Sequence, residues 1–250
     1  MVAKLKIEHL QAKLYLKSYL DEKSIVNFIH QLLVSYNIKN QIRLLDIGCG
    51  PGRLFSEYNS YGWDITCLEP DIEYYSFACK QAELYSNIGV NLGGFNDIRQ
   101  FHNCKFNIVV SINDPLSYIY TVEERVTAIR NIYALLEVGG IFFVEVPNFV
   151  WILRNYVSPT NEVFMVDDYK VNRQISHDFD YHNHIWIHKD IYTIEDEVIE
   201  KLHPMALLTP LELIYFFREA GFQEIRTHCD YTKVENQPIN SKLILLSGRK

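Results

Sequence analysis

Apolar residues recur every three or four positions in the first forty residues, a spacing typical of amphipathic helices. The clearest stripe consists of Ile25, Phe28, Ile29, Leu32 and Leu33. A weaker stripe with the same spacing runs through residues 10–19. We therefore predict helices over residues 1–40, which we expect to form a lid over the rest of the chain.

From residue 41 to residue 149, short apolar runs alternate with segments of helical spacing. The expected strands are 43–47, 64–68, 90–92, 106–112 and 141–146. The expected helices are 55–61, 72–85 and 122–136. Strands that alternate with helices are joined by right-handed crossovers and form a parallel sheet. The pattern predicts an α/β fold.

The alternation stops after Pro147, and residues 150–204 follow a different pattern. Residues 171–179 and 183–192 alternate with period two, and a third extended run covers 197–202. We interpret this segment as a small antiparallel β-meander inserted into the α/β domain.

The helical pattern resumes at Thr209, where a capping-box sequence precedes a helix that ends at Gly221. Residues 222–227 and 243–247 are the last two expected strands, and they could pair as a hairpin. Residues 41–149 and 205–250 then form one core, a Rossmann-like doubly wound sheet of seven mostly parallel strands.

Composition and charge narrow the possible partners. The chain has 250 residues, 48% of them hydrophobic, and a net charge of −7, which opposes non-specific binding to nucleic acid. The five cysteines are scattered without a CxxC pair, so they support neither a disulfide framework nor a zinc site. A reduced, cytoplasmic environment is the simplest expectation. No apolar run is long enough to span a bilayer, so we expect no membrane partner.

The most informative segment is LLDIGCGPGR at residues 44–53, in which a buried strand leads Asp46 into a turn containing Gly48, Gly50 and Gly52. Glycine permits positive φ and a close approach of a ligand to the backbone. Open α/β sheets bind ligands beyond the carboxyl ends of their strands, where this turn would lie. The spacing is GxGxG, unlike the GxGxxG of dinucleotide sites. Asp46 suits a cationic amino-acid head group better than a phosphate.

Two further acids follow the next two strands. Glu69 ends the second strand, where an acid binds ribose hydroxyls in this architecture. Asp97 follows the third strand, where its carboxylate or a neighbouring backbone N–H could reach the edge of an adenine.

Several motifs in this order resemble those of the class I S-adenosylmethionine-dependent methyltransferases of the small-molecule type. They are LDIGCGPGR at 45–53, LEPD at 68–71, NDIRQF at 96–101, FNIVVSIND at 106–114, LLEVGG at 135–140 and TPLELIYFFREAGF at 209–222. The resemblance covers residues 40–149 and 205–250 and implies that S-adenosyl-L-methionine is the cofactor. The residues that it places at the cofactor are Asp46, Gly48, Cys49, Gly50, Gly52, Glu69, Pro70, Asp97, Ile98, Ser111 and Asn113. Asn96–Asp97 departs from the Gly–Asp found in many relatives.

The resemblance also suggests where the methyl acceptor binds. Asn113 and Tyr118 follow the fourth strand, where family members often contact the acceptor. The segment NDPLSY matches the NPPY motif of amino-nitrogen methyltransferases only loosely, because Asp114 and Leu116 replace a proline and the tyrosine. We therefore expect methyl transfer to N or O of a small molecule and do not infer DNA methylation.

Three other functions remain open. They are a non-catalytic regulatory subunit that binds the cofactor, a protein or RNA methyltransferase, and a nicotinamide-dependent oxidoreductase. The absence of a basic segment disfavours RNA, and the GxGxG spacing disfavours nicotinamide.

The insert is rich in histidine. Strand alternation would place His182, His184, Trp186 and His188 on one face, with His177 on the neighbouring run. We expect a polar, aromatic sheet surface and no bound metal; a metal site or a catalytic base is the alternative. The insert is expected to cover the acceptor or to form a homodimer contact.

Overall fold

The computed structural model describes residues 21–39, 41–155, 160–166 and 169–250, so the weaker helical stripe over residues 10–19 lies outside the described residues. The strands are β1 (Arg43–Ile47), β2 (Asp64–Glu69), β3 (Ile88–Leu92), β4 (Phe106–Ser111), β5 (Leu136–Pro147), β6 (Thr160–Val166), β7 (Tyr169–Asp180), β8 (Ile185–Ile194), β9 (Glu197–Ala206), β10 (Gln223–His228) and β11 (Leu243–Arg249). The helices are α3 (Glu22–Ser35), α4 (Phe55–Ser60), α5 (Ile72–Ala82), α6 (Val122–Leu135), α7 (Phe149–Asn155) and α8 (Pro210–Ala220), with short 3₁₀ turns η1 (Ile98–Phe101) and η2 (Pro115–Tyr118).

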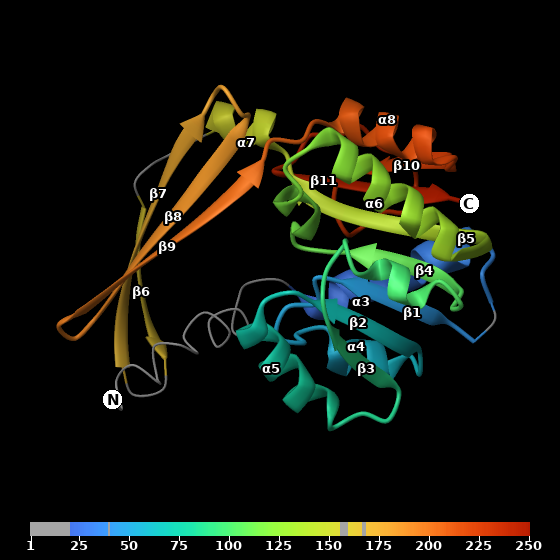
Figure 1. Ribbon diagram of the computed structural model, residues 1–250, viewed down its shortest axis with the longest axis horizontal. Helices are drawn as coiled ribbons and strands as arrows, with labels where there is room; N and C mark the ends of the chain where they lie inside the picture. The colour runs from blue at the N-terminus through green and yellow to red at the C-terminus, as the bar shows by residue number, and fades with distance from the viewer. Residues whose placement is uncertain (1–20, 40, 156–159, 167–168) are drawn as a thin grey trace.

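The core is a seven-stranded sheet in the order β10-β11-β5-β4-β1-β2-β3 (Figure 1). Strands β1 to β5 run parallel to one another, and β11 is antiparallel to both β5 and β10. The central strands are buried on both faces, which explains their nearly continuous apolar runs. The expected Rossmann-like fold and the terminal hairpin are confirmed.

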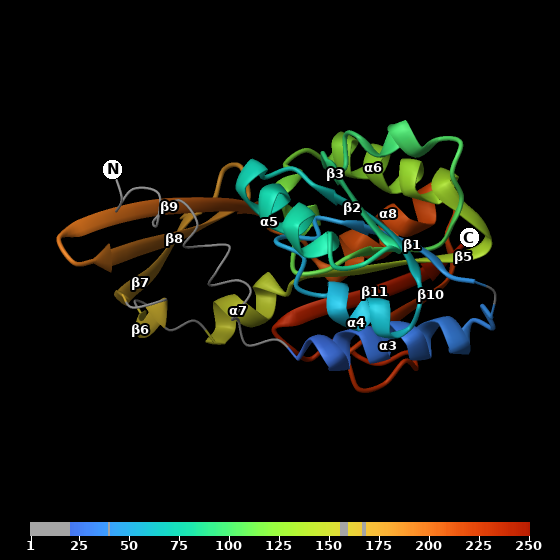
Figure 2. The same cartoon turned by 90° about the horizontal axis from the view of Figure 1, so that it is seen from below.

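Helices cover both faces of this sheet (Figure 2). Helices α3 and α4 pack on one face, where Phe28 and Tyr58 join the same apolar cluster as the sheet residues Leu44 and Val110. Helices α6 and α8 pack on the other face. The strong stripe of the N-terminal segment therefore forms part of the core layer, and a lid stays a prediction for residues that the structure does not describe.

Helix α8 begins and ends as the sequence indicates. Thr209 and Glu212 form a reciprocal capping box, with Thr209 N donating to Glu212 Oε2 at 2.8 Å. Gly221 ends the helix with φ +103°, a left-handed conformation that glycine adopts without steric cost.

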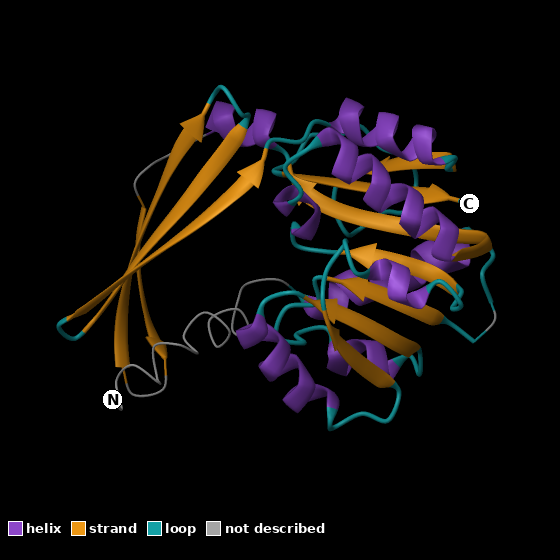
Figure 3. Ribbon diagram, viewed as in Figure 1, coloured by secondary structure: helices purple, strands orange, loops and turns teal. Residues whose placement is uncertain are grey.

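The insert is a separate four-stranded antiparallel sheet in the order β6-β7-β8-β9, whose strands are orange in Figure 3. The sequence analysis missed β6, because its apolar residues Val163–Val166 are contiguous and do not alternate. It also began the middle strand too early. His182 and His184 lie in the turn before β8, so the expected row of three histidines on this strand is wrong.

The inserted sheet stands beside the carboxyl edge of the core, on the side to which the arrowheads of the parallel strands point (Figure 1). Trp186 of β8 packs on Phe149, which directly follows β5, with ring centroids 5.6 Å apart. The Tyr120 hydroxyl, after η2, donates to Pro204 O of β9 at 3.1 Å. These contacts join the insert to the loops that follow β4 and β5.

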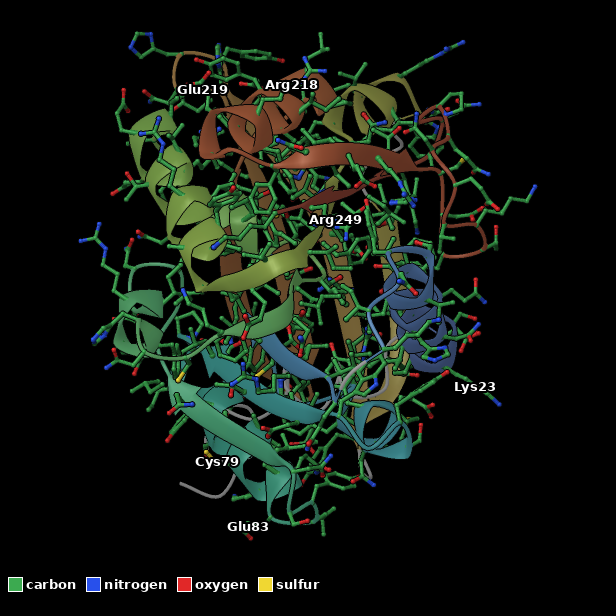
Figure 4. All side chains as sticks on the ribbon, turned by 90° about the vertical axis from the view of Figure 1, so that its right-hand side faces the viewer. Lys23, Cys79, Glu83, Arg218, Glu219 and Arg249 are labelled. Atoms are coloured by element: carbon green, nitrogen blue, oxygen red, sulfur yellow. The ribbon has the colours of Figure 1, made fainter. Side chains whose placement is uncertain are left out.

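The opposite end of the molecule is shown in Figure 4. There Arg249 of β11 forms an ion pair with Glu224 of β10 at 3.0 Å, which ties the terminal hairpin together. None of the described helices has the length and apolar character needed to cross a membrane.

Gly48 offers a test of the packing at the carboxyl edge. Its φ is +80°, and a Cβ on this residue would lie 2.4 Å from Cγ of Pro115. We expect Gly48→Ala to lower the free energy of unfolding by about 1–3 kcal/mol through overpacking against a rigid ring. Chemical denaturation measures this change.

Gly62→Ala is the matched control, because Gly62 has φ +66° but no atom within 4 Å of the added carbon. Gly62→Ala therefore introduces the strain of alanine at positive φ but no steric clash. Equal stability of the two variants would show that the contact between Gly48 and Pro115 does not constrain the fold.

Candidate active site at the carboxyl edge of the sheet

The glycine turn bends back toward β2 immediately after β1. Gly48, Gly50 and Gly52 all have positive φ, at +80°, +59° and +89°. The N–H groups of Gly48 and Cys49 both donate to Leu68 O, at 2.8 and 3.1 Å. The turn is therefore anchored to the neighbouring strand, and its left-handed residues explain why glycine is needed there.

The glycines do not all serve the same purpose. A Cβ on Gly52 would lie 2.7 Å from the Phe55 ring, so this glycine permits the close packing of α4. Cys49 is partly buried, and its thiol lies 3.5 Å from Gly50 O. Of the predicted cofactor residues in this turn, Gly48 and Gly52 are thus required by packing, whatever else they contact.

Glu69 holds the turn from the end of β2. Its carboxylate accepts hydrogen bonds from Gly50 N at 2.8 Å and from Asp71 N at 2.9 Å. The residue is only 5% exposed, and burial raises its pKa to about 7. A carboxylate offers about four lone-pair sites, so two remain for a ribose. Glu69 thus supports the glycine turn, and its contact with a ribose stays a prediction.

Asp46 lies next to Glu69 and is even more deeply buried, at 2% exposure. Tyr58 donates its hydroxyl to Asp46 Oδ2 at 3.2 Å. Burial, opposed by the Tyr58 hydrogen bond and aided by the negative charge of Glu69, raises the Asp46 pKa to about 7. Two adjacent buried acids without a cation are costly to ionise, which makes this edge a site for a positively charged ligand.

The loop after β3 reaches the same edge. Asp97 Oδ2 accepts the Gly94 N–H at 2.9 Å, and Gly94 lies against Pro70. Ile98 is fully buried in the apolar cluster beneath α6. The structure thus brings Pro70, Asp97 and Ile98 next to the glycine turn, while a contact from them to an adenine stays a prediction.

The loop after β4 contains two consecutive left-handed residues that are not glycine, Asn113 at φ +63° and Asp114 at φ +78°. Ser111, which ends β4, is fully buried, and its hydroxyl has no hydrogen-bond partner among the described residues. Asp114 is 9% exposed, and burial raises its pKa well above the usual range. Sequence reasoning placed Asn113 here and left Asp114 out of the site.

Tyr118, at the end of η2, connects the cofactor residues with the insert. The residue is 46% exposed, yet burial of its phenol raises the hydroxyl pKa. The negative charges of Asp114, Glu69 and Asp190 raise this pKa further. Tyr118 therefore lies within electrostatic reach of both β2 and the inserted sheet, and its position beside an acceptor stays a prediction.

Glu145 is the second site residue that sequence reasoning missed. It lies near the carboxyl end of β5, is 2% exposed and accepts a hydrogen bond from the Tyr231 hydroxyl. Burial raises its pKa, and the positive charges of Arg53 and Lys242 partly offset that shift. The signal was present in the sequence as a single acid inside the apolar run Ile141–Val146.

The histidines of the insert form a hydrogen-bonded network around Asp190. His177 and His188 share a hydrogen bond of 2.8 Å, and His188 Nε2 lies 3.1 Å from Asp190 Oδ1. Arg173 Nε donates to the same oxygen at 2.8 Å. No group of His, Cys, Asp and Glu able to hold a metal occurs among the residues described. The network gives the sheet an inner face that is polar and aromatic.

Comparisons with known proteins bear on the domain and on the fold. Residues 44–140 match the model of a family described as a methyltransferase domain. No curated protein matches the chain.

Solved structures share the whole fold. The CcbJ methyltransferase from Streptomyces caelestis has a TM-score of 0.77 at 18% identity, covering 92% of this chain and 89% of that one. The sugar N-methyltransferase KedS8 from Streptoalloteichus sp. has a TM-score of 0.74 at 16% identity, with coverages of 92% and 88%. The amino pentose methyltransferase CalS10 from Micromonospora echinaspora has a TM-score of 0.71 at 15% identity, covering 96% of each chain. At these identities the likeness establishes the fold.

Residues 44–140 thus match a methyltransferase domain, and the chain shares its fold with solved S-adenosylmethionine-dependent methyltransferases. CalS10 was solved with S-adenosylmethionine bound, and S-adenosyl-L-methionine stays the cofactor that the sequence motifs predict for this chain. The buried acids fit it, because the cofactor carries a sulfonium and an amino group.

Glu69 allows a direct test of the cofactor site. Glu69→Ala should weaken cofactor binding by about tenfold to a hundredfold, since hydrogen bonds to a charged group contribute roughly 1.5–3 kcal/mol. Glu69→Gln should lose less, because its amide keeps one acceptor oxygen. Calorimetric titration with S-adenosylhomocysteine provides the affinities.

Glu83→Ala is a suitable control, because Glu83 is an exposed acid at the end of α5. It should bind as the wild type does. Equal affinities for wild type, Glu69→Ala, Glu69→Gln and Glu83→Ala would reject the ribose contact.

Proposed function

We propose that this enzyme transfers a methyl group to the nitrogen of a small-molecule amine, with amino sugars as the leading class of acceptor. The observation that carries the choice of nitrogen over oxygen is the set of buried acids at the carboxyl edge. Asp46, Glu69, Asp114 and Glu145 are all nine-tenths buried or more. Positive charges lower the pKa of Glu145 alone among these four acids.

The charge balance of the site favours an acceptor that carries a positive charge. Asp46 and Glu69 lie by the glycine turn, where they would hold the amino group and the ribose of the cofactor. Asp114 lies on the acceptor side, after β4. An amine is a cation in neutral solution and compensates a buried carboxylate, whereas a hydroxyl does not.

The cofactor supplies an activated methyl group on a sulfonium, which is already a good leaving group. The residues of the chain then have three tasks: to align the acceptor, to exclude water and to leave the attacking nitrogen unprotonated. Tyr118 and Asn113 are positioned to align the acceptor. The inner face of the inserted sheet, with Trp186 packed against Phe149, would exclude water.

The similar structures support this choice without deciding it. Two of them are described as a sugar N-methyltransferase and an amino pentose methyltransferase. Acceptors of those enzymes carry the amine that the acidic site of this chain would complement. The net charge of −7 supports a small acceptor over RNA.

Self-association through the insert and a cytoplasmic location also stay proposals. Val163 and Val198 are exposed on the outer face of the inserted sheet, in one cross-strand row with Asn172 and Thr193. A second copy of the chain would cover these apolar side chains. The five free cysteines support a reducing environment.

The test is turnover with matched pairs of acceptors. Purified protein and S-adenosylmethionine are mixed with free and nucleotide-linked amino sugars, each paired with the sugar that has a hydroxyl in place of the amine. We expect S-adenosylhomocysteine release and a methylated product for members of the amine set, and at least tenfold slower release for their hydroxyl partners. Mass spectrometry identifies the methylated atom.

Two results would contradict the proposal. Faster methylation of the hydroxyl sugars would assign oxygen as the target. Stoichiometric cofactor binding without turnover on any acceptor would favour a non-catalytic role.

A further inference from the structure

Asp114 is a buried carboxyl group for which the described residues supply no partner. Neither of its carboxylate oxygens makes a hydrogen bond there, and both atoms are inaccessible to solvent. Buried ionisable groups are almost always paired, because removing a charge from water without compensation costs several kcal/mol. A group left in this state indicates a ligand that completes it.

The groups that shift the pKa of Asp114 include no positive charge. Burial raises the Asp114 pKa most, the nearby Ser117 hydroxyl lowers it, and the negative charge of Glu145 raises it by less than Ser117 lowers it. The Tyr118 phenol also faces Asp114. Arg53 acts on Glu145 and forms an ion pair with Glu22 at 3.3 Å. The groups that face Asp114 are thus neutral or negative.

The position of Asp114 indicates which ligand it would bind. It follows β4 by three residues, next to Ser111 and Asn113, and a buried cofactor acid, Glu69, acts on the same Tyr118 phenol. The inserted sheet reaches the same loop, because the Tyr120 hydroxyl, two residues after Tyr118, donates to Pro204 O of β9 at 3.1 Å. Asp114 therefore lies where the acceptor would meet the cofactor.

We propose that Asp114 binds the amine of the methyl acceptor and takes the proton that its nitrogen must lose before methyl transfer. This inference rests on the proposed function. In the first step a proton moves from the ammonium group to the Asp114 carboxylate, which leaves a neutral amine and a neutral carboxylic acid. The nitrogen lone pair then forms the bond to the methyl carbon, and the C–S electron pair returns to sulfur.

Burial favours this proton transfer. In a poorly solvated site, a neutral acid beside a neutral amine is more stable than the corresponding ion pair, because neither partner then carries a charge. The same burial makes the Asp114 carboxylate a stronger base than a carboxylate in water. Burial of the Asp114 carboxyl group destabilises the free enzyme but promotes proton transfer in the reaction.

The test uses Asp114→Asn, which keeps the size of the side chain and tolerates the left-handed backbone at φ +78°. With the amine that turns over fastest, we expect kcat/KM at pH 7 to fall about a hundredfold, within the usual range for loss of a general base. The affinity for S-adenosylhomocysteine should not change. The deficit should shrink above pH 9, where the amine loses its proton to water, and a merely structural role would not produce this pH dependence.

Asp64→Asn is the matched control, because Asp64 is an exposed acid at the opposite edge of the sheet. A second measurement does not depend on turnover: methylammonium chloride, the simplest amine, should raise the melting temperature of the S-adenosylhomocysteine-loaded wild type and not of Asp114→Asn, relative to equal sodium chloride. The role of Asp114 would be overturned if wild type and Asp114→Asn had equal kcat/KM values at all pH values, or if methylammonium raised their melting temperatures equally. Either result would leave N-methylation itself intact.

Discussion

Burial of four carboxyl groups at one edge of the sheet is the constraint on which the site depends. Asp46, Glu69, Asp114 and Glu145 come from β1, β2, the loop after β4, and β5, and parallel strands bring their carboxyl ends to the same edge. A folded chain tolerates such acids only when they stay protonated or when a cation joins them. These acids therefore fit positively charged ligands, which the proposed function supplies as the cofactor and an amine.

The fold supports these acids through backbone contacts. Glu69 accepts the N–H groups of Gly50 and Asp71, so the acid and the glycine turn fix each other. Pro115 packs so closely on Gly48 that the loop after β4 is held against the turn after β1. The residues predicted to bind the cofactor and the acceptor are thereby parts of one packed unit, and a change in one loop should affect the other.

The inserted sheet adds a second, chemically different wall. Its inner face carries the Asp190 network of His177, His188 and Arg173, whose hydrogen bonds satisfy one another. Its contact with the core runs through Trp186 and Phe149 and through Tyr120, so the wall is fixed to the loops that follow β4 and β5.

The sequence predicts the core because its signals are local. Apolar runs, the glycine turn and the capping box at Thr209 each specify a short segment, and their order specifies the sheet. It predicts the insert less well, since β6 lacks alternation and the turn before β8 has no glycine to mark it. Asp114 and Glu145 were missed for a different reason: their importance comes from burial beside acids distant in sequence, which spacing along the chain does not reveal.

The most direct test of the account is a calorimetric titration of S-adenosylmethionine between pH 6 and pH 8, in buffers with different ionisation enthalpies, beside a titration of NAD. Burial raises the pKa of both Asp46 and Glu69 to about 7, and a bound cation lowers it again, so binding near pH 7 should release protons and affinity should rise with pH. Asp46→Asn should release fewer protons, and NAD should not bind. Binding of NAD without any response to S-adenosylmethionine, or binding of S-adenosylmethionine with no proton release and no dependence on pH, would contradict the account.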